Sequence, residues 1–549
     1  MDTIKIQAYK LISKNAYIIS LFLIGLLFLT PILYPGFYIS QDGEAHVARF
    51  AAYFKAFSDG QFPARWAGNL NYGYGSPLFI FFYPLPGYLA SFIHFFGISY
   101  EASYKLLISS SFILGPIFLF LWLSSRAKKE IAFATSIIYL LLPYRLLDTF
   151  VRGDIAEMIS FVFVPLIFLF IDRAQEEENI KPIVFGSLAY GLFILSHNGM
   201  AAIFSPVFLV YSIIIAKNKK DFIRSVSIFI LGLLISCFFW LPATIEGKFV
   251  YEKLVVDTLY KANFVPLFNL FYSSWGFGPD INLKGGLSPQ IGVLYASIPI
   301  LTIFFIRKFK EKKEIIFWMI VFFGAAFMTT GYSEFLWKQL PVIRQMGYPW
   351  RFAALSGFAS CMVIFFVINH FKNRSLLITL IFLFVISSIP FIKVKGYATH
   401  TDYFYNSYQG TTDYHLRTSS IWTAGDFWKK PKSELEIIGG QGHIKNFSKK
   451  SNLHKFIADA KTQMSILDNT VYFPGWKVKI DNRRVPIQFQ DMNHRGLITF
   501  GIPKGSHMVR VVFEESPVRF VADYISLFGL FLLLLLFCLR SRINRILKR

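Results

Sequence analysis

Three side chains capable of acid–base chemistry, Asp42, Glu44 and His46, lie within five positions directly after the first long apolar run. Apolar residues at helical spacing follow over 47–57, which predicts an amphipathic helix. If this helix begins before Asp42, then Asp42 and His46 share a face and Glu44 points away from it. If Asp42 caps the helix, its carboxylate instead accepts hydrogen bonds from backbone N–H groups.

A carboxylate at this place fits two functions. It could act as the general base that takes a proton from an acceptor hydroxyl. It could also bind a divalent cation, Mg²⁺ or Mn²⁺, for which Asp42 and Glu44 are the expected ligands. The base chemistry requires no cofactor, so the cation is an alternative and not a requirement.

A second polar group, Arg152-Gly-Asp-Ile-Ala-Glu157, precedes another apolar run. Asp154 with Glu157 three residues later is a capping-box pattern at a helix N-terminus. Arg152 at such a helix end also suits a phosphate, because a guanidinium binds phosphate oxygens in a bidentate manner. The sequence favours capping alone and capping combined with substrate binding equally.

Four further candidates lie at the ends of apolar runs. His197 fits either a helix-end residue or a group that lines a substrate pocket. Trp350 is typical of an aromatic anchor at the membrane interface, and Arg351 beside it could extend to that interface. In the alternative interpretation, Arg344 or Arg351 faces a lipid-linked phosphate.

The elements that must position these groups are predicted to be membrane helices. The chain has 549 residues, 54% of them hydrophobic and 18% aromatic, with a mean hydropathy of +0.48. Runs of about 20 apolar residues recur, each long enough to cross ~30 Å of hydrocarbon. We expect a polytopic helical membrane protein with about twelve spans, near 16–37, 103–123, 131–150, 155–172, 182–197, 200–216, 222–243, 288–306, 315–331, 351–370, 375–392 and 519–539.

The net charge of +23 is explained by basic loops between these spans. The segment 76–97 is apolar but contains Pro77, Pro84 and Pro86, which disfavour a continuous helix. If it forms a hairpin or an interfacial helix in the outer leaflet, the basic loops all fall inside, as the positive-inside rule requires. Both termini are then cytoplasmic, and nucleic-acid binding is not expected.

This topology places the candidate residues together on the outer side of a plasma or inner membrane. We expect a transmembrane domain over 1–392, with a first outer loop at 38–75. The block 393–518 has turn-rich sequence and strands of alternating polarity, such as 476–480 and 508–513. It is predicted to form an extracytoplasmic antiparallel β-sandwich, followed over 519–549 by a final helix and a basic cytoplasmic tail.

Several of these motifs together resemble the GT-C superfamily of glycosyltransferases that use polyprenyl-phosphate sugars. They resemble more closely the membrane family described as related to 6-pyruvoyl-tetrahydropterin synthase, although no pterin-synthase zinc site is visible. The outer block resembles that of bacterial membrane proteins implicated in glycosylating teichoic acids. The motifs that carry these resemblances are Asp42-Gly-Glu44, Trp66, Tyr72-Gly-Tyr-Gly-Ser-Pro77, Arg152-Gly-Asp-Ile-Ala-Glu157, Ser196-His197, Tyr348-Pro-Trp-Arg-Phe352 and Tyr472-Phe-Pro-Gly-Trp476.

The resemblance implies inverting transfer of a sugar from a polyprenyl-phosphate donor to a glycan, lipid or protein acceptor of the cell envelope. Asp42 would activate the acceptor, with Glu44 as a second acid. Arg152 and Arg351 would stabilise the departing phosphate, and Asp154 and His197 would line the pocket beside membrane lipid. A transporter or flippase of lipid-linked sugars and a non-catalytic scaffold for envelope assembly are the alternatives, although no internal repeat typical of transporters is visible.

Overall fold

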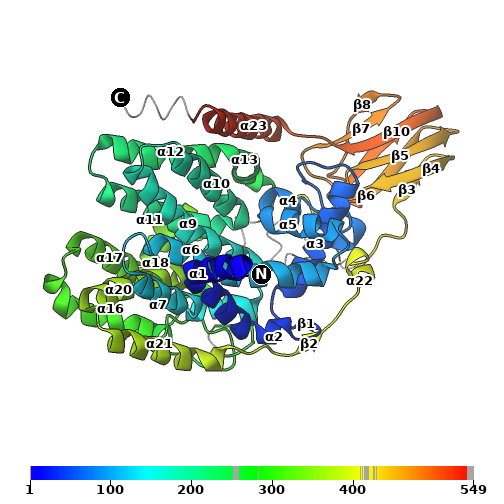
Figure 1. Ribbon diagram of the computed structural model, residues 1–549. Coiled ribbons are helices and arrows are strands. Elements are labelled where there is room, and N and C mark those ends of the chain that lie inside the picture. The colour runs from blue at the N-terminus through cyan, green and yellow to red at the C-terminus, as the bar shows by residue number, and fades with distance from the viewer. Residues whose placement is uncertain are drawn as a thin grey trace.

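The computed structural model describes residues 2–251, 259–281, 283–408, 410, 412, 419–423, 427 and 429–540, with side chains from residue 15 onward. Most of the chain forms a helical bundle, and β-sheets lie at one end of it (Figure 1). Helices α3, α4 and α5 lie between the bundle and the sheets (Figure 1). The predicted fold, a polytopic helical protein with an antiparallel β-sandwich near the C-terminus, is confirmed.

Every predicted span coincides with at least one helix. The long helices follow the apolar runs and end where charged or proline-containing connectors begin. They are α1 (Asp2–Phe28), α6 (Tyr100–Leu123), α7 (Lys129–Leu140), α9 (Ile155–Glu176), α10 (Lys181–Ser196), α11 (Asn198–Ile215), α12 (Lys219–Ile235), α13 (Cys237–Glu246), α16 (Val293–Phe305), α17 (Lys312–Thr329), α20 (Phe352–Phe371), α21 (Arg374–Ser388) and α23 (Pro517–Cys538).

By length and composition, six helices of the described chain could cross a membrane, or up to nine if bent pairs count as single spans. The bends measure 45° after α7, 68° between α12 and α13, and 91° after α17. The bend after α7 leads to α8 (Pro143–Leu147), whose N-terminal proline cannot continue the preceding helix. This count does not confirm the predicted number of twelve spans, and two shorter apolar helices, Asn15–Phe28 and Lys181–Ser196, stand outside it.

The segment 76–97 contains two short helices, α4 (Leu78–Phe81) and α5 (Leu85–Phe95). Pro84 precedes α5, and the two helices do not form one continuous element. Phe92, Phe95 and Phe96 are largely exposed at the end of α5. An 11-residue helix is too short to cross ~30 Å of hydrocarbon, and its exposed apolar face fits a helix that lies at the membrane interface.

The C-terminal strands form two antiparallel sheets. One has five strands in the order β4-β5-β10-β7-β8 and the other has three in the order β3-β6-β9. Apolar side chains of both sheets form a common core, as expected for strands with one buried face. Their bounds are β3 (Leu435–Gly439), β4 (Gly442–Lys450), β5 (Leu453–Ala460), β6 (Met464–Val471), β7 (Trp476–Ile480), β8 (Arg483–Val485), β9 (Leu497–Ile502) and β10 (Gly505–Phe513).

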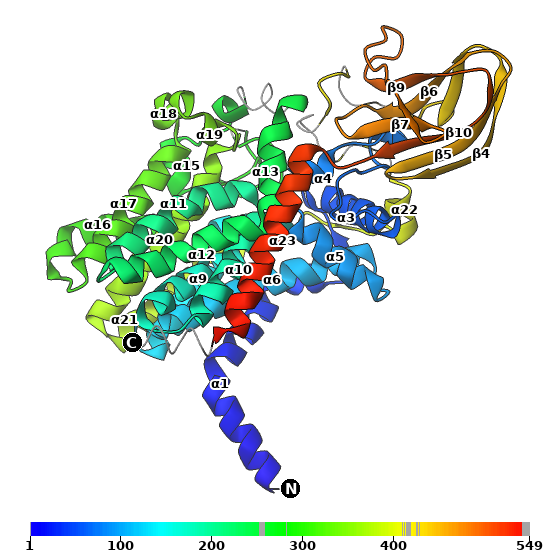
Figure 2. The same cartoon turned by 90° about the horizontal axis from the view of Figure 1, so that it is seen from above.

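The first loop fastens this sandwich to the bundle. Arg65 donates hydrogen bonds to Glu515 (3.2 Å), Asp523 (2.6 Å) and the carbonyl oxygen of Phe238 (2.8 Å). Trp66 packs edge-on against Trp476 of β7. Helix α23 then runs from the sandwich across the bundle (Figure 2). The loop, the sandwich and α23 are therefore held in one arrangement.

A two-stranded sheet holds the chain just before Asp42. Strand β1 (Phe37–Tyr38) pairs with β2 (Tyr397–Ala398), and Ile39 N donates to Gly396 O at 2.8 Å. Helix α3 (Gly43–Ser58) begins five residues after β1 and buries most of its residues. The β1–β2 pair and α3 together fix the turn that carries Asp42.

Candidate active site

A cavity of about 720 Å³ opens between the start of α3, the turn before α9 and the segment before α20. Six of the ten predicted site residues line it, so the fold brings together groups that are up to 309 positions apart. The six are Asp42, His46, Arg152, Asp154, Trp350 and Arg351.

Asp42 occupies the N-cap position of α3, but its carboxylate accepts no capping hydrogen bond. The backbone N–H of Asp42 donates to Arg152 O at 2.7 Å, which fixes the residue at the cavity wall. Within the described part of the chain the carboxylate makes no hydrogen bond or ion pair. Burial raises the pKa of Asp42 to about 6, against the opposing effect of Arg152. Such a carboxyl group can accept a proton near neutral pH.

The turn after Arg152 requires its glycine. Gly153 has φ +67°, and a Cβ built there would lie 2.3 Å from Ser40 Oγ and 2.7 Å from the Tyr104 hydroxyl. Tyr104 donates to the Gly153 carbonyl oxygen at 2.7 Å. The glycine therefore lets the turn pack directly beside the segment that leads to Asp42.

Asp154 caps α9 as the sequence predicts. Its Oδ1 accepts from the N–H groups of Ala156 and Glu157, both at 3.1 Å. Its Oδ2 accepts from Arg152 at 2.8 Å. Although burial alone would raise it, the Arg152 guanidinium holds the pKa of Asp154 well below its usual value. Asp154 is thus a fully bonded anion and a poor proton acceptor.

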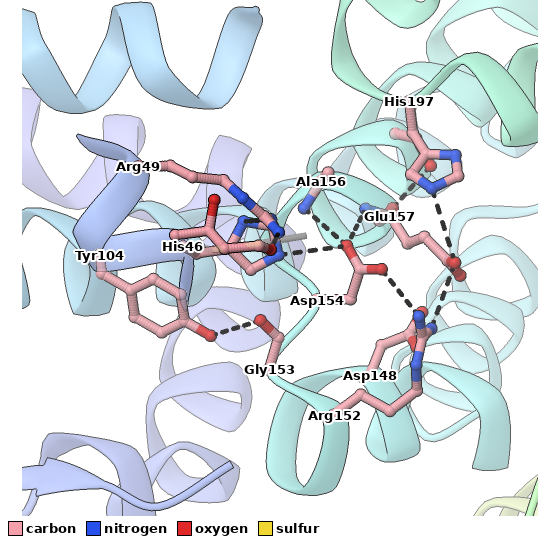
Figure 3. Close-up of polar contacts among 12 residues, drawn as sticks. His46, Arg49, Tyr104, Asp148, Arg152, Gly153, Asp154, Ala156, Glu157 and His197 are labelled. Carbon is pink, nitrogen blue, oxygen red and sulfur yellow. Dashed lines mark hydrogen bonds and ion pairs between the residues drawn. The ribbon is translucent and has the colours of Figure 1, made fainter. Parts of the chain in front are cut away.

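Glu157 is fully buried and connects Arg152, with which Figure 3 shows it, to Arg351. Its Oε1 lies 3.2 Å from Arg152 Nη1 and accepts from Arg351 Nε at 2.8 Å. Its Oε2 accepts from the Tyr144 hydroxyl at 2.7 Å. Arg152 also pairs with Asp148. Glu157 is therefore an anchor that orients guanidinium groups, and it does not line the cavity.

The two histidines are held by their Nδ1 atoms and direct their Nε2 atoms at carboxylates (Figure 3). His46 Nδ1 lies 3.4 Å from Arg49 Nη1, and its Nε2 lies 3.9 Å from Asp154. His197 Nδ1 accepts from the N–H of Met200, and its Nε2 lies 3.7 Å from Glu157. Burial and Arg49 lower the pKa of His46 to about 3, so this ring is neutral at physiological pH.

Trp350 is buried and does not anchor an interface, which corrects that interpretation. Its ring lies under the Arg152 guanidinium, with the Cζ atom 4.6 Å from the ring centroid. Its Nε1 donates to Asn263 Oδ1 at 3.2 Å. The quadrupole of the Trp350 ring attracts the Arg152 guanidinium and so helps to hold it in place.

Arg351 faces the cavity with an unused donor. Its Nε bonds to Glu157, and its Nη1 donates to Met346 O at 3.0 Å. Its Nη2 makes no hydrogen bond to any described residue. Arg351 also lines a second cavity of about 320 Å³, together with His197, Phe82 and Tyr83. This side chain therefore stands between two hollow spaces.

Besides Glu157 and His197, two further predicted residues do not line the larger cavity. Glu44 is half-exposed on the other face of α3, with His400 at 3.8 Å. Arg344 lines neither cavity. Asp42 and Glu44 therefore do not face a common point, and the geometry does not support a metal site formed by these two residues.

Sequence reasoning missed Arg49, Tyr83 and Asp148. Arg49 lines the cavity and donates to Thr412 O, and its Cζ lies 4.1 Å from the centroid of Phe82. It lies three residues after His46 on α3, a spacing that places both on one face and could have revealed it. Tyr83 lies 5.0 Å from the His197 ring, centroid to centroid, and no local pattern indicates this contact.

The sequence matches the family described as 6-pyruvoyl-tetrahydropterin synthase related domain, membrane protein, over residues 79–394. The chain belongs to this family. The matched region contains Arg152, Asp154, Glu157, His197 and Arg351, whereas Asp42 and the β-sandwich lie outside it. The predicted resemblance to this family is thereby confirmed.

Comparison with curated proteins found no match. Among solved structures, the chain is similar to the arabinofuranosyltransferase AftD from Mycobacteria, with 11% identity, a TM-score of 0.43 and coverage of 69% of this chain and 26% of that one. It is also similar to the Archaeoglobus fulgidus oligosaccharyltransferase, with 12% identity, a TM-score of 0.38 and coverage of 73% and 56%. The chain thus spans about a quarter of the former and just over half of the latter.

Among the described residues, Asp154, Glu157 and His197 form a possible set of metal ligands. Each offers one ligand atom, and these atoms lie within 4.8 Å of one another. These oxygens already accept hydrogen bonds from Arg152, Arg351 and backbone N–H groups. A cation there would meet two guanidinium charges at close range. The set fits an arginine-neutralised cluster better than a metal centre.

Proposed function

We propose that the protein is a membrane glycosyltransferase that transfers a sugar from a polyprenyl-phosphate donor to a cell-envelope acceptor. The observation that carries the proposal is the carboxylate of Asp42, which has no partner among the described residues, in a cavity that arginine side chains also line. A base and a set of cations on one cavity are what acceptor activation and departure of an anionic phosphate require.

The reaction is a single displacement that inverts the anomeric carbon. Asp42 accepts the proton of the acceptor hydroxyl as its oxygen forms a bond to that carbon. The bond between the anomeric carbon and the phosphate oxygen breaks, and its electron pair leaves with the lipid phosphate. Arg351, through the Nη2 group that no described residue engages, and Arg49 stabilise the growing negative charge.

Arg152 has a different role in this proposal. It is nearly fully buried and engaged by Asp148, Asp154 and Glu157. Although Arg152 lines the cavity, these three carboxylates neutralise its charge, and it keeps Asp154 ionised and orients the turn that hydrogen-bonds Asp42. Glu44 and Arg344, which lie away from the cavity, have no role in it.

The same proposal places the cavity and the sandwich outside the membrane and both termini inside. Arg126, in a predicted inner loop, pairs with Glu314 at 2.7 Å and Asp172 at 3.6 Å.

The proposal divides the chain into a transmembrane domain over 1–392, an outer domain over 393–518 and a C-terminal helix with its tail. Residues 541–549 of the basic tail and part of the loop 244–287 lie outside the described residues.

The test is a transfer assay with purified protein in nanodiscs. It uses a panel of polyprenyl-phosphate hexoses and pentoses with envelope glycan, lipid and peptide acceptors. We expect transfer with one donor class, inversion of the anomeric configuration by NMR, and loss of transfer in Asp42→Asn. Movement of the donor between leaflets without a new glycosidic bond would favour a flippase, and transfer at the wild-type rate by Asp42→Asn would overturn the proposed base.

A further inference from the structure

A third cavity, of about 400 Å³, lies between the first loop, the segment after α22 (Asp402–Asn406) and the edge of the β-sandwich. Five lysines line it, with Glu434 as the single acidic lining residue. The lysines come from α3, from the segment before β3 and from β4, namely Lys55, Lys430, Lys432, Lys449 and Lys450.

Only two of these lysines are neutralised by the described chain. Lys55 pairs with Asp59 at 2.8 Å, and Lys449 pairs with Glu434. Lys430, Lys432 and Lys450 form no ion pair with any described residue. Three unpaired ammonium groups on one cavity repel one another, and an anion bound among them removes that repulsion.

The walls of this cavity are fixed by contacts between the first loop and the sandwich. Asp59 Oδ2 accepts from Ser451 N at 2.7 Å, and Gln61 donates to Ser451 Oγ at 2.9 Å. Gly68 packs so closely that an added Cβ would lie 2.6 Å from Ser451 Cα. The lysines of α3 and β4 are therefore held near one another by defined backbone contacts.

The cavity also carries sugar-compatible surface. Tyr72 and Tyr408 line it, together with the amides of Asn69 and Asn406. Tyrosine rings supply flat apolar faces with a polar edge, and amide groups both donate and accept hydrogen bonds. Ammonium groups beside such surfaces suit a glycan or polyol chain that bears negative charges.

Helix α3 connects this cavity to the candidate active site. Arg49 lines the cavity of Asp42, and Lys55 lines the lysine-rich cavity. Six residues separate them, which is about 9 Å along the helix axis. A chain molecule held by the lysines can therefore extend to Asp42, whereas a small acceptor cannot occupy both cavities.

We propose that the lysine-rich cavity binds an anionic glycopolymer, with repeating phosphate or carboxylate groups, that serves as the acceptor. Its identity as the acceptor rests on the proposed glycosyltransferase function, but the binding of a polyanion does not. The sandwich domain supports the assignment, since residues 429–518 contain 15 Lys and Arg against eight Asp and Glu.

The test measures binding of full-length protein in zwitterionic nanodiscs to fluorescent inorganic polyphosphate, polygalacturonate and neutral dextran. The variant replaces Lys430, Lys432 and Lys450 by alanine. The matched control replaces Lys461, Arg495 and Lys504, which are exposed on the same sandwich but line none of the described cavities. Both variants lose three positive charges, so a difference between them reports position and not net charge.

We expect both polyanions to bind and neutral dextran not to bind. The cavity variant should lose affinity about tenfold and show a weaker salt dependence, while the control changes less than about twofold. Asp42→Asn should bind like the wild type, which separates this result from the outcome of the transfer assay. The two polyanions distinguish phosphate from carboxylate as the preferred group.

Three results would overturn the inference. One is equal affinity of the cavity and control variants. A second is competition by monomeric glycerol phosphate as strong as by polymer at equal anion concentration, because the site would then hold a single anion. The third is loss of polymer binding in nanodiscs with anionic lipids, which would make lipid headgroups the occupant.

Discussion

Arg351 Nε donates a 2.8 Å hydrogen bond to Glu157 Oε1, although 194 positions separate the two residues. This bond joins the segment before α20 to the first turn of α9. It holds one edge of the guanidinium group against a buried anion, while Arg351 lines the cavity. The site is therefore assembled from charged groups that pair with one another and from the Asp42 carboxylate, which accepts no hydrogen bond from the described residues.

Removal of the buried anion should unfold or loosen this assembly. Glu157→Ala leaves Arg152 and Arg351 without a shared partner, a change that costs about 3–5 kcal/mol for buried ion pairs. We expect a clearly lower melting temperature by intrinsic tryptophan fluorescence. Glu44→Ala is the matched control because its carboxylate is half-exposed; an equal loss of stability in both variants would contradict the anchor role.

Arg351→Lys tests the cavity-facing donor. Lysine keeps the charge but lacks the planar fork, so it cannot bond Glu157 and a phosphate oxygen together. We expect the transfer rate constant kcat to fall about 10²-fold, with a smaller change in donor KM and in melting temperature. Arg344→Lys, which lies outside both cavities, should leave all three values unchanged.

The pH profile tests Asp42 directly. Only the ionised carboxylate accepts a proton, so activity is present above its pKa and is lost as pH falls through about 6. We expect kcat/KM to be about tenfold lower at pH 5 than on its plateau. An unchanged profile between pH 5 and 7 would assign the base to another group.

The ionised form of Asp42 that activity needs should lower the stability of the fold. Burial raises the pKa of Asp42, so ionising this carboxyl group costs folding free energy. Stability is therefore lost as the pH rises from the ordinary pKa of an aspartate toward about 6. Asp42→Asn should therefore be at least as stable as the wild type at pH 7.5, with the difference shrinking near pH 4. A lower melting temperature at pH 7.5 would show that the carboxylate is needed for folding.

Chelation should have little effect. The oxygens of Asp154 and Glu157 are bonded to Arg152 and Arg351, and Glu44 does not share a cavity with Asp42. We expect transfer to persist in EDTA and metal analysis of purified protein to show less than one bound ion per chain. Restoration of a chelator-inactivated enzyme by Mg²⁺ or Mn²⁺ would contradict this expectation.

Much of the fold could be predicted from local sequence signals. Apolar runs located the helices, and alternation located β7 at Trp476–Ile480 with its bounds intact. Residues 487–489 also alternate in polarity, but they form only a single bridge through Gln488 to Thr499. The bends after α7 and α17 were not predicted, because tertiary packing and not hydropathy decides where an apolar run changes direction.

The candidate site was predictable where the signal is local. The capping pattern identified Asp154. The predicted membrane topology alone placed Asp42, His46 and Arg351 on the same side of the membrane. The sequence could not predict which aspartate is the proton acceptor and which is the helix cap, because Asp42 and Asp154 differ only in their partners. Asp154 accepts three hydrogen bonds from the protein, and Asp42 accepts none from the described residues.

The pairing of β1 with β2 affects how this protein can be divided. Strand β1 enters the turn of Asp42, and β2 begins the segment that leads to the sandwich. A truncated protein that ends after α21 would leave the backbone groups of Phe37 and Tyr38 without their strand partner. The segment after α21 is therefore part of the scaffold that holds Asp42, and a minimal active fragment has to retain residues 397–398 even if it lacks the sheets.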